Sequence, residues 1–395
     1  MYLTSFVQRD RLFNIAERWF CGRPQPADAR SLTEILMCDV FIIRETLHSL
    51  SRRLLNIAGA SHVRQKDIRR KGELRDLICC DSRQPTLRIA ELFNRYRKNP
   101  DYYYRETPIN ASVFFDDRGQ MLGSYRVKRP KRIAEKANRR IADWIFGNVK
   151  DVAESMARER AQRSGVPLEH FVTPPHEMEK EFIAAEELIA AQFRNGTSRF
   201  DRDALTIHDT GAIKIVGDED MLERLARELH SVPDITVLEQ EQFSGNFQAM
   251  KVVLELPWEA EAVCRRYSED RAWEKNRERG IPQEELCKGL EPLLEGASPT
   301  ISIEVILTTF ADLVESELGN SIHEERIISQ RDSSRYRGNI PMNVEFLVEF
   351  LFAVGFSPRI SLEDVPIKIW GRYLPETLGS YIRQLYSLPD HDFFA

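Results

Sequence analysis

The sequence lacks the features that mark several common protein classes. It contains no run of about 18 apolar residues, so no membrane-spanning helix is expected. Its first residues lack the basic end and the long apolar core of a secretory signal peptide. Its 6 cysteines form no C-x-x-C pair, and no histidine stands at zinc-ligand spacing from them. We therefore expect a cytoplasmic protein of a reducing compartment that does not associate with a membrane.

An excess of positive charge is also missing. The chain has 56 Lys and Arg against 62 Asp and Glu, a formal net charge of -6. Any site for a polyanion must therefore be a local basic cluster. With 42% hydrophobic and 30% charged residues, the composition is that of an ordinary globular protein, and 395 residues suffice for two or three domains.

Hydrophobic periodicity divides the chain into three parts. Residues 1–109 are predicted to be helical throughout, and residues 331–395 mostly helical. Between them, residues 110–330 alternate strands with helices, which predicts an α/β (α+β) domain with a mixed β-sheet. Within it we expect two helices at 130–146 and 149–163, and a charged helical insertion at about 258–298. The predicted strands are 111–115, 121–128, 206–207, 212–216, 236–243, 247–256 and 301–308.

The strand at 301–308 carries a carboxylate in an apolar setting. Ile301, Ile303 and other alternate residues form one face, and Glu304 lies on the other. A charge there is costly unless it meets a cation, a metal or hydrogen bonds. Glu304 is therefore either a strand-edge glutamate in a structural ion pair or a functional residue.

A basic cluster follows the second predicted hairpin strand. Between Arg126 and Arg140, 8 of 15 residues are basic and one is acidic. On a helix, Arg132, Lys136 and Arg139 share one face, separate from an apolar face. The cluster is either a solvated surface or a cradle for a polyphosphate, to which a helix N-terminus adds its backbone amides.

Two further segments carry polar groups at strand ends. Asp209 precedes the strand at 212–216, where a carboxylate often holds Mg²⁺, although a strand-initiating turn explains it equally well. The loop before the strand at 247–256 contains Phe247, which is either a core residue or a flat surface for a base. Lys251 is either solvated or reaches a phosphate.

In order along the chain, these segments resemble the motifs of the RelA/SpoT family, which makes the alarmone (p)ppGpp. The family pattern R-x-K-x-x-x-S-I-x-x-K fits Arg126, Lys128, Ile133 and Lys136, with Arg132 in place of Ser. The pattern D-x-x-G-x-R resembles Asp209, Ala212 and Lys214. G-Y-Q-S-L-H resembles 246–251, V-E-V-Q-I-R-T resembles 303–309, and A-E-x-G-x-A-A-H resembles 316–323. The resemblance covers about 111–328.

The resemblance implies a nucleotidyltransferase-like synthetase domain and an activity of the stringent response. Such enzymes move the β,γ-pyrophosphate of ATP onto the 3′-hydroxyl of GDP or GTP. It implies that Asp209 and Glu304 are catalytic and hold Mg²⁺, that Glu304 is the base near the 3′-hydroxyl, and that Phe247 stacks on guanine. The other implied nucleotide-binding residues are Arg126, Lys128, Arg132, Lys136, Lys214, Lys251, Glu317 and His323.

The departures from the family patterns fall mostly on the acceptor side. Thr308 replaces an Arg, and Lys251 replaces a His. Three hypotheses therefore stay open: transfer to a guanosine nucleotide, transfer to the 3′ end of tRNA as in toxin-like relatives, and a non-catalytic nucleotide-binding regulator. The helical flanks are expected to pack on the central domain or to form a homo-oligomer.

Overall fold

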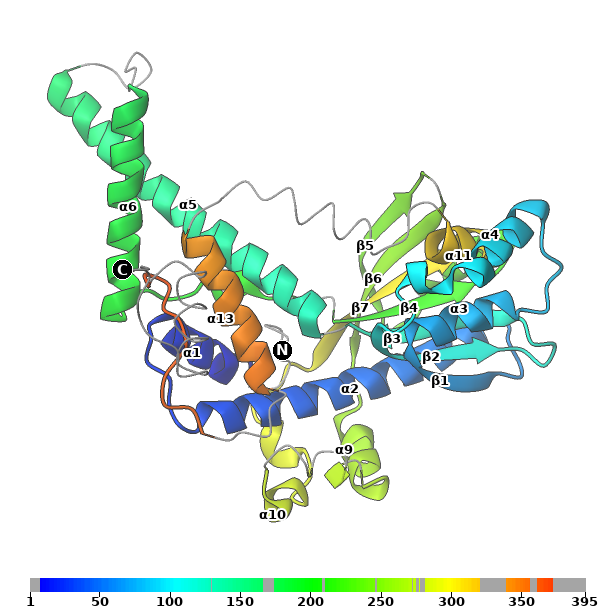
Figure 1. The fold of residues 1–395 in the computed structure, drawn as a ribbon. Helices are drawn as coiled ribbons and strands as arrows, with labels where there is room; N and C mark the ends of the chain where they lie inside the picture. The colour runs from blue at the N-terminus through cyan, green and yellow to red at the C-terminus, as the bar shows by residue number, and fades with distance from the viewer. Residues whose placement is uncertain are drawn as a thin grey trace, which may run out of the picture.

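The protein is built around one seven-stranded sheet in the order β1-β2-β3-β4-β7-β6-β5 (Figure 1). The computed structural model describes residues 8–128, 130–165, 174–207, 210–245, 247–271, 273–274, 277, 281–319, 339–355 and 361–371. β4 and β7 pair in parallel and the other neighbours are antiparallel, which confirms the predicted α/β fold with a mixed sheet. The strands are β1 (Arg64–Arg70), β2 (Pro108–Phe115), β3 (Met121–Val127), β4 (Gly211–Val216), β5 (Thr236–Phe243), β6 (Ala249–Pro257) and β7 (Thr300–Thr308).

Helices cover both faces of the sheet and form a separate helical half. The described helices are α1 (Arg9–Phe20), α2 (Asp28–Ile57), α3 (Lys71–Cys79), α4 (Leu87–Lys98), η1 (Pro100–Tyr103), α5 (Pro130–Ser164), α6 (Pro175–Asn195), α7 (Arg202–Leu205), α8 (Glu219–Leu229), α9 (Ala260–Glu269), α10 (Gln283–Leu286), η4 (Glu291–Leu293), α11 (Phe310–Leu318) and α13 (Asn339–Gly355). None of them is long and apolar enough to cross a membrane.

β7 lies in the interior of the sheet, between β4 and β6. Its alternation is as predicted: Ile301, Ile303, Val305 and Leu307 are buried in the core shared with α2, and Glu304 lies on the other face. The strand is therefore central, and the expectation of a strand-edge glutamate is wrong in this respect.

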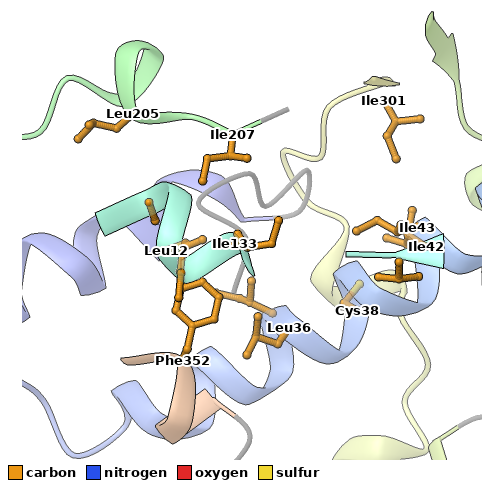
Figure 2. Close-up of a cluster of buried hydrophobic side chains, with 14 of the residues drawn as sticks. Leu12, Leu36, Cys38, Ile42, Ile43, Ile133, Leu205, Ile207, Ile301 and Phe352 are labelled. Atoms are coloured by element: carbon orange, nitrogen blue, oxygen red, sulfur yellow. The ribbon is translucent and has the colours of Figure 1, made fainter. Parts of the chain in front are cut away.

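The two faces of the sheet bury two different apolar clusters. The first contains Ile213 and Val305 and extends through α2 into the helical half. Figure 2 shows Leu12 of α1, Leu36 of α2 and Phe352 of α13 in this cluster. The second contains Val113 with side chains of α3, α4 and α11. Long α2 thus belongs to both halves of the molecule, and α13 packs on α2 and α5 (Figure 1).

Four sequence expectations need correction. Residues 64–70 form β1 at the sheet edge, so the first 109 residues are not helical throughout. A single helix, α5, replaces the two predicted at 130–146 and 149–163. Residues 206–207 are not in a strand, and the insertion at 258–298 contains only the short helices α9, α10 and η4 in its described part.

Gly123 in β3 is required by the close approach of β4. A Cβ added to it would lie 2.4 Å from the backbone oxygen of Lys214. We expect Gly123→Ala to push the two strands apart and to lower the free energy of unfolding by about 1–3 kcal/mol, as overpacking usually does. Gly147→Ala in α5 is the control, because nothing lies within 4 Å of its added Cβ. Urea unfolding compares the two, and equal stabilities would contradict this account.

Candidate functional site

The candidate site lies on the sheet face that α11 partly covers, where three neighbouring strands present charged side chains. Arg126 of β3 pairs with Ala212 of β4, and Ala212 pairs with Glu304 of β7. Side chains two residues apart on a strand share a face. Arg126, Lys214 and Glu304 therefore point to the same side, although they are far apart in the sequence.

Lys128 and Glu304 form an ion pair at the open end of this face. Lys128 Nζ donates to Glu304 Oε2 at 3.0 Å, and the two side chains are 13% and 20% exposed. The backbone N–H of Lys128 also bonds the carbonyl of Thr210, which fixes the end of β3 beside the start of β4. Glu304 thus pairs with a cation, as its structural interpretation predicts. That cation, Lys128, is itself one of the residues predicted to bind phosphate.

Lys214 and Glu317 meet in a more deeply buried network. Lys214 Nζ donates to Glu317 Oε1 at 3.0 Å, and Arg75 of α3 lies 3.8 Å from the other carboxylate oxygen. Burial alone would raise the pKa of Glu317, but Lys214, Arg75, Lys71 and Arg126 together lower it well below its ordinary value. The carboxylate is therefore ionised and surrounded by cations.

The space beside this network is too small for a nucleotide. Ser124, Lys214, Leu313 and Glu317 help to line a cavity of about 20 Å³, which holds about one water molecule. Lys214 and Glu317 therefore join α11 to the sheet in this structure. Of the two ion pairs, that of Lys128 and Glu304 has the more exposed carboxylate, since Glu304 is 20% exposed and Glu317 is 6% exposed.

Sequence reasoning did not find Lys71 and Arg75. Both belong to α3, and they are 3% and 1% exposed. The backbone carbonyl of Glu317 accepts a hydrogen bond from Arg75 Nε at 3.1 Å. Their spacing of four residues on a helix was an available signal, but nothing in the sequence indicates that α3 packs against α11, more than 200 residues later.

The predicted acceptor side is arranged around Lys251 and the loop before β6. Lys251 Nζ donates to Glu239 and Glu241 of β5, at 2.9 Å each. Burial would lower the pKa of Lys251, but these two hydrogen bonds raise it above its ordinary value. Phe247 is half-buried, and the next residue, Gln248, donates its backbone N–H to Asp312 at the start of α11.

The helix that carries the basic cluster divides into two faces, as predicted. Ile133, Ala137 and Ile141 are buried, whereas Arg139 is exposed. Arg140 bonds the backbone carbonyl of Thr206. Lys136 is half-buried and has its own polar partners. The side chain of Arg132 lies outside the described part of the structure, as do Asp209 and His323.

Glu304 is the one predicted magnesium ligand whose side chain lies in the described part of the structure. Among the described residues, no group of three or more His, Cys, Asp or Glu is placed to hold a metal ion. Mg²⁺ is, however, usually bound by one or two carboxylates together with substrate phosphates. Thr210, which follows Asp209 in the sequence, is fully buried, and its Oγ1 has no hydrogen-bond partner in the described structure. A carboxylate such as that of Glu304 is of the ligand type that such a site uses.

No protein-family model matches the chain, and no curated protein matches it. Among solved structures, it is similar to the small alarmone synthetase 1 from Bacillus subtilis, with 11% sequence identity. The match covers 59% of this chain and 75% of the other, with a TM-score of 0.19. A likeness this weak does not transfer roles from one protein's residues to the other's.

Proposed function

We propose that the protein transfers the β,γ-pyrophosphate of ATP to the 3′-hydroxyl of a guanosine nucleotide at the sheet face of Arg126, Lys128 and Glu304. The observation that supports this most is the ion pair of Lys128 and Glu304, 3.0 Å long and partly exposed. In this proposal, Lys128 is a phosphate-binding cation and Glu304 is the carboxylate base beside it. Phosphoryl transfer needs both groups.

The reaction assigns a different task to each member of the pair. The 3′-oxygen of the acceptor forms a bond to the β-phosphorus of ATP, the bond from that phosphorus to the oxygen on the α-phosphate breaks, and AMP leaves. Glu304 accepts the proton of the 3′-hydroxyl. Lys128 and Arg126 bind the ATP phosphates, for which Lys128 turns from Glu304 toward the incoming anion. Magnesium on Asp209 and Glu304 would neutralise charge on the phosphates.

Lys214 and Glu317 have a supporting role in this proposal. Their hydrogen bond joins α11 to β4, which pairs with β3 and β7. Arg126 also lies close enough to lower the pKa of Glu317.

The experiment is incubation of the purified protein with γ-labelled ATP and Mg²⁺, with GDP, GTP and bulk tRNA in separate reactions. Label in a guanosine product supports the proposal. Label on tRNA would instead assign the protein to the RNA-modifying alternative. ATP binding without transfer to any acceptor would favour the non-catalytic regulator.

The carboxylates around Lys251 should weaken binding of a polyphosphate acceptor. We expect the double variant Glu239→Gln, Glu241→Gln to free the Lys251 ammonium and to lower the KM for GDP roughly threefold to tenfold, the scale of partly exposed ion pairs. The kcat should stay constant. Glu255→Gln, farther along β6, is the control and should leave the KM unchanged. A KM that does not respond in the double variant would place the acceptor phosphates away from Lys251.

A further inference from the structure

A second and larger cavity lies behind β3, on the face of the sheet that α2 covers. Its volume is about 520 Å³, and side chains of α2, α9, β1 and β3 line it. Small-molecule sites are usually between about 300 and 1,000 Å³. Tyr125 lines this cavity, and the next residue of β3, Arg126, points to the opposite face, where the candidate site lies.

Three arginines from two helices line the cavity. Arg44 and Arg52 come from α2, and Arg266 comes from α9. Arg44 donates to Asp67 at 2.9 Å, and Arg266 donates to Glu45 at 2.7 Å. A guanidinium has five N–H donors, so each of these arginines keeps donors for a ligand.

Arg52 differs from the other two because it has no carboxylate partner in the described structure. It is exposed, one turn of α2 beyond His48. Asp67 and Glu45 thus pair with two of the three arginines, and Arg52 is the one without such a pair in the described structure.

His48 supplies a further polar group on the inner wall. Its ring meets the ring of Tyr125 edge-on, with 6.4 Å between centroids. Burial lowers the pKa of His48, with smaller contributions from Arg52, Arg266 and Arg44, while Glu45 acts in the opposite direction. A neutral imidazole can donate or accept a hydrogen bond beside the three guanidinium groups.

We propose that this cavity binds the phosphate groups of a small phosphorylated ligand. The planar guanidinium group of arginine can donate two parallel hydrogen bonds to two oxygens of one phosphate group. Arginines from two helices can approach such a group from different sides. An apolar ligand would leave these donors without partners. The inference does not depend on the proposed catalytic function, because none of the residues that bind here belongs to the candidate site.

The test is calorimetric titration of the full chain with inorganic pyrophosphate as the probe. We expect Arg52→Ala to weaken binding about tenfold or more, the effect of losing a charge-assisted hydrogen bond. Arg52→Lys keeps the charge but lacks the two parallel N–H donors of arginine, and it should weaken pyrophosphate binding less than Arg52→Ala does. Arg265→Ala, on α9 and outside the cavity, is the charge-matched control and should bind as the unchanged protein does.

Pyrophosphate can also bind at the candidate site, and Lys128→Ala separates the two possibilities. The proposal requires a binding event that Arg52→Ala weakens and Lys128→Ala does not. Binding that is lost only in Lys128→Ala, or that Arg52→Ala leaves unchanged, would overturn it. Because Arg52 is exposed and unpaired, its replacement should not impair folding, which circular dichroism checks.

Discussion

Glu304→Gln should lower the rate of pyrophosphate transfer by about 10²–10⁴-fold, the usual contribution of a general base. The amide has nearly the same shape as the carboxylate but cannot accept the proton of the 3′-hydroxyl. It also no longer holds Lys128 by charge, so the affinity for ATP, measured without Mg²⁺, should stay the same or rise. A loss of kcat without a loss of ATP binding is therefore the expected pattern.

The matched control for this prediction is Glu255→Gln. Glu255 is a half-buried carboxylate on β6, and its partner on β7, Ser302, is two residues from Glu304. It accepts a hydrogen bond from Thr300 at 3.3 Å and has no cation beside it in the described structure. Steady-state kinetics compare the kcat of the two variants, and only Glu304→Gln should lose it. If Glu304→Gln retains the rate of the unchanged protein, the base is another group.

Glu317→Gln should lower the free energy of unfolding by about 3–5 kcal/mol, as does removal of one partner from a buried ion pair. Lys214 and Arg75 would remain buried around an amide that carries no charge. Glu315→Gln, also on α11, is the control because its partner Arg88 is 45% exposed. Exposed pairs contribute about 1 kcal/mol or less. Chemical denaturation measures both, and equal losses would show that the Glu317 network does not stabilise the fold.

The same carboxylate should contribute to the acid sensitivity of the fold. The pKa of Glu317 is lower in the folded protein than its unfolded value of about 4.3. A group with a lowered pKa stabilises the fold at pH values above the unfolded pKa, and this contribution is lost as the pH falls below it. The unchanged protein should therefore lose stability more steeply than Glu317→Gln between about pH 5 and pH 3.

The sequence predicted the structure best where buried residues recur at a regular spacing along the chain. The alternation in β7 and the apolar face of α5 are both visible in the residues and both present in the structure. β1 was missed because Ile68 is its one buried residue between charged neighbours, so no alternating pattern exists. Its position depends on pairing with β2, about 45 residues later.

The site was predictable as a set of residue types and not as an arrangement. Lys128 and Glu304 were each expected to act, but their direct pairing follows from the order of β3, β4 and β7, which the sequence does not state. In the same way, Lys251 was considered alone, while its partners Glu239 and Glu241 face it across the β5–β6 hairpin. Long-range neighbours of a charge decide whether it is available to a ligand.

The central claim is that ATP binds at the ion pair of Lys128 and Glu304. The measurement that tests it most directly is titration with the Mg²⁺ complex of an ATP analogue whose α,β-bridging oxygen is a methylene group, so that no transfer occurs. Lys128→Ala should weaken a binding event that Arg52→Ala leaves intact, by about tenfold or more, and Arg265→Ala should not weaken it. Binding that is equally tight in Lys128→Ala would contradict the proposed site.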